Sequence, residues 1–154
     1  VAPFVCDVIT WIHIDDPIKA AERLALTEKD TFSSLREDLV NIVLEGEAGE
    51  RKIKEIIEYF RENKPTSILG LRVFKVEDYL TRTRYFEKHT DPIDLPISNV
   101  LKFVLEDGSW FVLRPSGTEP KLKIYIGVLG ESLEASELKN KSLKEAVTNL
   151  IDKI

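Results

Sequence analysis

A series of short strand-like segments constrains the fold of this chain more than any other feature. Residues 98–106 form a strand-like run with Leu101, Phe103 and Leu105 on one face and Val100, Lys102 and Val104 on the other, and the pair Asp107-Gly108 follows at once. That pair predicts a type I′ hairpin turn into a second strand at 110–113. A third alternating strand is predicted at 122–128, one short loop further on. Strands joined by such short connections pair antiparallel, so we expect an antiparallel sheet.

The rest of the pattern adds two helices and two strands. Apolar residues at spacings of three and four predict amphipathic helices over 48–62 and 136–154. Short β-rich runs at 39–44 and 71–79 predict further strands, and 80–97 is expected to be a long loop. The order is therefore β-α-β-β-β-β-α. It predicts an α+β fold with a mainly antiparallel sheet of four to five strands and both helices on one face.

The first part of the chain has a different character. Residues 1–36 carry an apolar start, and Asp16-Pro17 has the form of a helix N-cap followed by proline. We interpret this segment as an N-terminal arm or the remnant of a preceding domain. Residues 37–154 form the main domain. The chain contains no methionine, so we expect a fragment, a processed product or a trimmed chain.

Composition excludes several classes of function. The net charge of the 154 residues is -5, which argues against a general nucleic-acid binder. No apolar run approaches the roughly 20 residues that a membrane span requires. Cys6 is the single cysteine, so an internal disulfide or a cysteine zinc cluster is not expected. These properties favour a cytoplasmic protein with neither nucleic-acid nor membrane partners.

Two groups of polar residues resemble metal ligands but have simpler explanations. They are His13 with Asp15 and Asp16, and His89 with Asp91 and Asp94. Asp16 is better explained as a helix cap. The second group falls in the expected loop, where polar side chains are normally solvated. We therefore predict no metal site in this chain.

The loop from Arg114 to Lys121 reads Arg-Pro-Ser-Gly-Thr-Glu-Pro-Lys. The guanidinium of Arg114 offers a planar fork of donors that matches an edge of a phosphate group. Ser116 and Thr118 add hydroxyl donors. Gly117 lets main-chain amides approach an anion closely. The composition of this loop predicts that it binds an oxyanion.

The loop and its flanking strands, residues 105–125, closely resemble the phosphate-binding segment of one enzyme family. It is the C-terminal domain of the α-D-phosphohexomutases, which comprise phosphoglucomutases and phosphomannomutases. The resemblance implies a TATA-box-binding-protein-like fold and a domain that clamps the non-reacting phosphate of a hexose phosphate during intramolecular phosphoryl transfer. Two alternatives stay open: a free-standing regulatory module that binds phosphate or phosphosugar without catalysis, and a structural fragment whose loop is a relic.

The resemblance also implies roles for particular residues. The family's phosphate-binding positions, including the proline that shapes the turn, fall on Arg114, Pro115, Ser116, Gly117 and Thr118. Lys121 and Lys123 are expected to raise the local positive potential without an assigned contact. Glu119 should point away from the anion, toward a lysine.

Other parts of such an enzyme are missing from the sequence. We find no Thr-Ala-Ser-His-Asn-Pro-like serine loop, no Asp-Gly-Asp-x-Asp-Arg metal loop and no sugar-selecting Gly-Glu-x-Ser-Gly segment. The resemblance therefore implies that catalytic residues and Mg²⁺ ligands belong to the full-length enzyme and lie outside this chain. The expected partners are a hexose phosphate or bisphosphate and the remaining domains of the same enzyme. Alone, the chain should be inactive, and glucose or mannose preference is not encoded in it.

Overall fold

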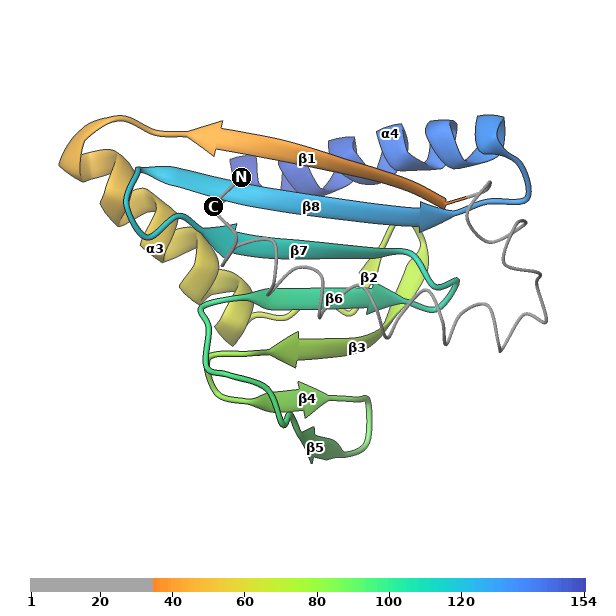
Figure 1. The fold of residues 1–154 in the computed structure, drawn as a ribbon, viewed down its shortest axis with the longest axis horizontal. Helices are drawn as coiled ribbons and strands as arrows, with labels where there is room; N and C mark the ends of the chain where they lie inside the picture. The colour runs from red at the N-terminus through yellow and green to blue at the C-terminus, as the bar shows by residue number, and fades with distance from the viewer. Residues whose placement is uncertain (1–34) are drawn as a thin grey trace.

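The structure, a computed structural model, describes residues 35–154 of the chain (Figure 1). This part contains eight strands and two helices. In chain order they are β1 (Leu35–Val43), α3 (Gly46–Glu62), β2 (Ser67–Ile68), β3 (Leu71–Asp78), β4 (Thr83–Tyr85), β5 (Thr90–Pro92), β6 (Leu101–Leu105), β7 (Trp110–Pro115), β8 (Lys121–Leu129) and α4 (Leu133–Asp152). The expected arm, 1–36, lies outside the described residues except for its last two, so its separation from the main domain stays a prediction.

The strands form one antiparallel sheet. Its order is β1-β8-β7-β6-β3-β4-β5, and β2 pairs with β3 off this path. Every pairing is antiparallel, which confirms the predicted α+β fold. The expected count of four to five strands was too low, because the sheet has eight. The strands missed are β2, β4 and β5, each of three residues or fewer.

The prediction of a long loop over 80–97 is wrong, because this stretch contains the β4–β5 hairpin. Arg82 has a φ of 54°, which lets the chain turn tightly from β3 into β4, where Asp78 lies opposite Thr83. The residues of β4 are only partly buried and those of β5 are exposed. Without a buried face, these strands carry no apolar alternation that would reveal them.

Both helices cover one face of the sheet, as predicted. Helix α4 packs along β1 and β8, and α3 packs against β7 and β8 (Figure 1). The predicted stripe of α3 is buried and consists of Ile53, Ile56, Ile57 and Phe60. In the core beneath the helices, Phe103 stacks on Phe111 with ring centroids 4.7 Å apart. Phe60 meets Phe103 edge-on at 5.9 Å, so aromatic packing joins α3 to the middle of the sheet.

The other face of the sheet carries a second, smaller core. Trp110, Val104 and Val112 pack there with Ile93 and Val100 from the segment before β6. As a result, all five residues of β6 are buried, including Lys102, whose ammonium lies 5.0 Å from the centre of a Trp110 ring. The central strands are thus covered on both faces.

The β6–β7 hairpin forms as predicted, but its turn is not type I′. Of the turn residues only Gly108 has a positive φ, 89°, whereas a type I′ turn needs two such residues. The Gly108 N–H donates to the Leu105 carbonyl at 3.0 Å, and the Leu105 N–H donates to the Ser109 carbonyl at 2.7 Å. This is a three-residue loop with glycine in the left-handed position. Asp107 stabilises it by accepting from the Ser109 N–H at 2.9 Å.

Asp107 is also expected to make stability depend on acid pH. Burial raises the pKa of Asp107, but the hydrogen bonds and charge of Lys139 and the Ser109 N–H lower it below 3.8 overall. A carboxyl with a depressed folded pKa stabilises above its unfolded pKa, and this contribution is lost as the pH falls through the folded pKa. We expect Asp107→Asn, which keeps an acceptor for Ser109, to lose about 1 kcal/mol at pH 7.

The measurement is urea unfolding of both proteins at several pH values. The difference in unfolding free energy should shrink as the pH drops below about 3.8. A difference that stays constant down to pH 2.5 would show that the Lys139 pair does not control the titration of Asp107.

Candidate functional site

The predicted oxyanion loop is a short connection between β7 and β8 that backbone hydrogen bonds hold in place. The Ser116 N–H donates to the Lys121 carbonyl at 2.9 Å, which closes the loop at its base. The Leu44 N–H donates to the Pro120 carbonyl at 3.0 Å. This second bond ties the loop to the connection between β1 and α3. The loop is therefore fixed both at its own base and by the β1–α3 connection.

Ser116 shapes the turn through its hydroxyl oxygen. That oxygen accepts from the Glu119 N–H at 3.3 Å and, at the limit of hydrogen-bond length, from the Thr118 N–H at 3.5 Å. Its proton stays available for an outside acceptor, because the hydroxyl can donate while it accepts. Within residues 35–154, the Gly117 N–H and the Thr118 hydroxyl have no hydrogen-bond partner.

Gly117 is not required by the fold. A Cβ built at this position meets no atom within 4 Å, and its φ is not positive. Neither packing nor backbone geometry therefore selects glycine here. The missing side chain matters only to a group that approaches the loop from outside.

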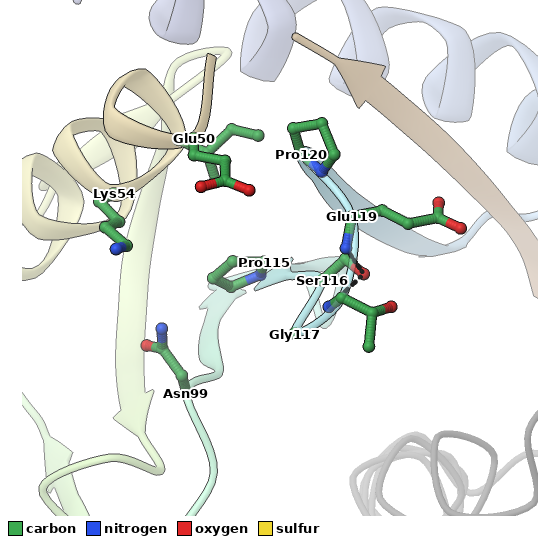
Figure 2. Close-up of a pocket in the computed structure, with 10 residues that line it drawn as sticks. Glu50, Lys54, Asn99, Pro115, Ser116, Gly117, Glu119 and Pro120 are labelled. Atoms are coloured by element: carbon green, nitrogen blue, oxygen red, sulfur yellow. Dashed lines mark hydrogen bonds between the residues drawn. The ribbon is translucent and has the colours of Figure 1, made fainter. Parts of the chain in front are cut away.

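A cavity of about 350 Å³ lies between the loop and helix α3 (Figure 2). Its lining residues are Glu50, Ile53, Lys54, Asn99, Pro115, Ser116, Gly117, Thr118, Glu119 and Pro120. The loop forms one wall, the N-terminal half of α3 forms another, and Asn99 closes a third side. Four of the five predicted phosphate-binding residues thus share one cavity.

Arg114, the fifth predicted residue, does not line this cavity. Side chains alternate along β7: Leu113 packs in the core under the helices, whereas Val112 packs on the other face. By this alternation Arg114 belongs to the face opposite the helices. The structure therefore places Arg114 beside the loop, on the far side of the sheet from the cavity.

Arg114 lies directly opposite Lys123 in the β7–β8 register. Among the described residues, neither side chain forms an ion pair or a hydrogen bond. Like charges directly opposite each other in an antiparallel pair are destabilising. Two cations thus lie side by side at the base of the loop without an ion-pair partner among the described residues.

Lys121 differs from Lys123 because it has a partner. Its ammonium lies 2.7 Å from a carboxylate oxygen of Glu119, which confirms that Glu119 turns toward a lysine. The hydrogen bond and the charge of Lys121 lower the pKa of the Glu119 carboxyl. The positive charge of Lys121 is thus largely offset, whereas Lys123 forms no ion pair among the described residues.

Three polar residues of the cavity were not found from sequence. Glu50 and Lys54 lie on α3, and Asn99 lies in the segment before β6. Charged residues on the polar face of an amphipathic helix are normally solvated, so the sequence alone gives Glu50 and Lys54 no special role. Glu50 and Lys54 reach the cavity because α3 packs beside the loop. The spacing of residues within one helix cannot reveal a contact with a distant segment.

The candidate metal groups do not assemble in the described part of the chain. His89 lies 3.6 Å from Asp91, with both side chains exposed, while Asp94 lies near Arg82 instead. In residues 35–154 no three histidine, cysteine or acidic side chains are grouped to hold a metal ion. His13, Asp15 and Asp16 lie outside the described residues.

Neither α3 nor α4 has the length and apolarity that crossing a membrane would need.

Known proteins resemble this chain over most of its length. Residues 39–143 match the family model described as phosphoglucomutase/phosphomannomutase, C-terminal domain. A phosphoglucomutase of Staphylococcus aureus strain MRSA252 is 39% identical over 138 residues, covering 82% of this chain and 25% of that protein. The phosphoglucomutases of strains USA300 and MSSA476 are 38% and 37% identical over the same shares.

The chain therefore spans about a quarter of the length of these relatives. The match includes residues 39–43 of β1, the whole loop and residues 133–143 of α4. From the family model and the sequence identity we conclude that the chain belongs to the phosphoglucomutase/phosphomannomutase C-terminal domain family.

Proposed function

We propose that this chain is the phosphate-clamping C-terminal domain of a phosphoglucomutase or phosphomannomutase. In this role it binds the non-reacting phosphate of a hexose phosphate. The observation that carries the proposal is the cross-strand pair of Arg114 and Lys123, which forms no ion pair with a carboxylate among the described residues. An unbalanced pair of cations beside unpaired loop donors suits a dianion.

The phosphate would lie at the free rim of the loop. There the guanidinium of Arg114 reaches it from one face of the sheet. The Gly117 N–H and the hydroxyls of Ser116 and Thr118 reach it from the cavity side. These contacts recognise charge and shape rather than one sugar pose. They would fix the far end of the substrate and so raise the effective concentration of the reacting end.

The chemical step would take place outside this chain. We propose that the remaining domains of the enzyme supply the phosphorylated serine and the carboxylates that hold Mg²⁺. That ion would neutralise charge on the transferred phosphoryl group. The residues described here would only bind and orient the substrate. They would do so as part of a domain that helps to exclude water from the cleft.

A titration followed by two-dimensional ¹H–¹⁵N NMR tests this proposal. The 154-residue chain is titrated with inorganic phosphate and, separately, with glucose 1-phosphate. We expect saturable shifts of the amides of Ser116, Gly117 and Thr118 and of the Arg114 Nε–H with both ligands. If these resonances stay fixed while distant surface lysines shift, the loop is not the binding site.

The isolated chain should show no mutase activity. It contains no counterpart of the family's serine loop or metal loop, so no group is available to give and take a phosphoryl group. A coupled assay that detects glucose 6-phosphate formed from glucose 1-phosphate should stay at the buffer rate. Turnover that co-purifies with the pure chain would contradict the proposal.

Glu119→Gln should tighten phosphate binding. The substitution removes a negative charge next to the loop and releases Lys121 from its ion pair. A unit charge within ~10 Å contributes on the order of 0.5 kcal/mol in water, so the affinity for phosphate should rise about twofold. The gain should decrease at high salt, because exposed charges are screened. An affinity that does not change at low salt would show that this pair has no influence on the loop.

A further inference from the structure

The cavity beside the loop is larger than a phosphate group needs. Its volume is about 350 Å³, whereas a water molecule occupies ~30 Å³ of the liquid. A phosphate group has the size of only a few waters. The volume is within the range of small-molecule pockets, which starts at ~300 Å³. Space for a further part of the ligand therefore remains next to the loop.

The wall facing the loop carries groups of both signs. Figure 2 shows the Glu50 carboxylate, the Lys54 ammonium and the Asn99 amide directed toward the space between α3 and the loop. Glu50 and Lys54 are four residues apart on α3, a spacing that favours an ion pair. Within the described part of the chain, however, neither forms one. A carboxylate acceptor and an ammonium donor are thus both available in the cavity.

The amide of Asn99 is held in a defined orientation. Its oxygen accepts a hydrogen bond from Arg61 Nη2 at 2.8 Å. Arg61 is fixed in turn by a 3.0 Å contact from its Nε to a carboxylate oxygen of Asp78, whose side chain is 1% exposed. Because the amide oxygen is occupied by Arg61, the amide nitrogen is the group presented to the cavity, as Figure 2 shows.

We propose that this wall, formed by Glu50, Lys54 and Asn99, binds the hydroxyl groups of the sugar whose phosphate the loop holds. A hydroxyl both donates and accepts, so it matches a wall that offers an acceptor beside donors. A second phosphate does not match, because Glu50 would repel it. The inference rests on the proposed function and extends it, because it gives the domain contacts with the sugar as well as with the phosphate.

The test compares two ligands that differ only by the sugar. Glucose 1-phosphate and inorganic phosphate are titrated into the 154-residue chain and into its Glu50→Gln and Asn99→Ala variants, with NMR shifts as the readout. Each variant should bind glucose 1-phosphate about five- to tenfold more weakly, because one hydrogen bond to the sugar is lost. Inorganic phosphate should bind as before, or up to twofold more tightly in Glu50→Gln because a repelling charge is gone.

Glu47→Gln is the matched control. It is an exposed carboxylate on the same helix that does not line the cavity, and both ligands should bind it as they bind the unchanged chain. Equal affinity of Glu50→Gln and the unchanged chain for glucose 1-phosphate would overturn the inference and leave the phosphate clamp intact. So would an equal loss for both ligands. If the unchanged chain binds neither ligand, the proposed function itself fails.

Discussion

Replacing Arg114 with alanine is expected to weaken the binding of glucose 1-phosphate about 30- to 100-fold. The guanidinium can make two parallel charge-assisted hydrogen bonds to one phosphate edge. Their combined loss of about 2–3 kcal/mol converts to a fold-change of this size. Titration of the 154-residue chain, followed by the amide shifts of Ser116 and Gly117, gives the affinity of each variant.

Two controls separate the shape of the guanidinium from its charge. Arg114→Lys keeps the charge but loses the fork, so its affinity should fall between those of the unchanged chain and the alanine variant. Arg72→Ala removes an exposed arginine of β3 that lies away from the loop and pairs with Glu87. This substitution should change binding less than twofold. An Arg114→Ala chain that binds glucose 1-phosphate as tightly as the unchanged chain would remove this residue from the site.

The same substitution should have the opposite effect on the unliganded protein. Arg114 and Lys123 are directly opposed and lack a carboxylate partner in the described residues, so removing one cation relieves repulsion. Without phosphate, Arg114→Ala should therefore be as stable as the unchanged chain or slightly more stable. At a phosphate concentration that saturates the unchanged chain but not the variant, the order should reverse, because the unchanged chain gains more binding energy in the folded state.

Much of the fold could be predicted because its elements bury one face. Their apolar residues recur at the spacing of the buried face, and these residues are buried in the structure. Examples are the stripe of α3 from Ile53 to Phe60 and the alternating Leu122, Ile124, Ile126 and Val128 of β8. Periodicity and burial agree wherever a helix or strand packs against the core on one side. The loop that we predict to bind an oxyanion stands out for a different reason: its polar residues are not part of the core, so their chemistry is visible in the sequence.

The parts that could not be predicted depend on contacts between distant residues. β4 and β5 bury too little surface to leave a pattern. Dipeptide statistics favour a type I′ turn at Asp107-Gly108, but the ion pair to Lys139 on α4 and the bond to Ser109 select the three-residue loop. Asn99 enters the cavity only because Arg61 holds it. The Asp107–Lys139 ion pair and the Arg61–Asn99 hydrogen bond join residues that are remote in the chain, and local spacing does not report them.

A single methyl group at Gly127 is expected to destabilise the domain by about 3 kcal/mol. A Cβ at this position would lie 2.2 Å from Trp110 Cε2 and 2.3 Å from Cζ2. The φ of Gly127 is not positive, so the indole, rather than the backbone conformation, demands glycine. Trp110 is 4% exposed and belongs to the second core. It cannot move away without disturbing its neighbours, which places Gly127→Ala at the upper end of overpacking costs.

A double-mutant cycle identifies the indole as the cause. Trp110→Phe removes the part of the ring that overlies Gly127, so Gly127→Ala should cost less than about 1 kcal/mol in that background. Gly117→Ala is the matched glycine control, because a Cβ there meets nothing within 4 Å, and its stability should stay within about 0.5 kcal/mol. Urea unfolding of the four proteins of the cycle and of this control measures each effect. If Gly127→Ala were as harmless as Gly117→Ala, Trp110 could not lie over β8, and the register that sets Arg114 opposite Lys123 would lose its support, since the same pairing of β7 with β8 fixes both.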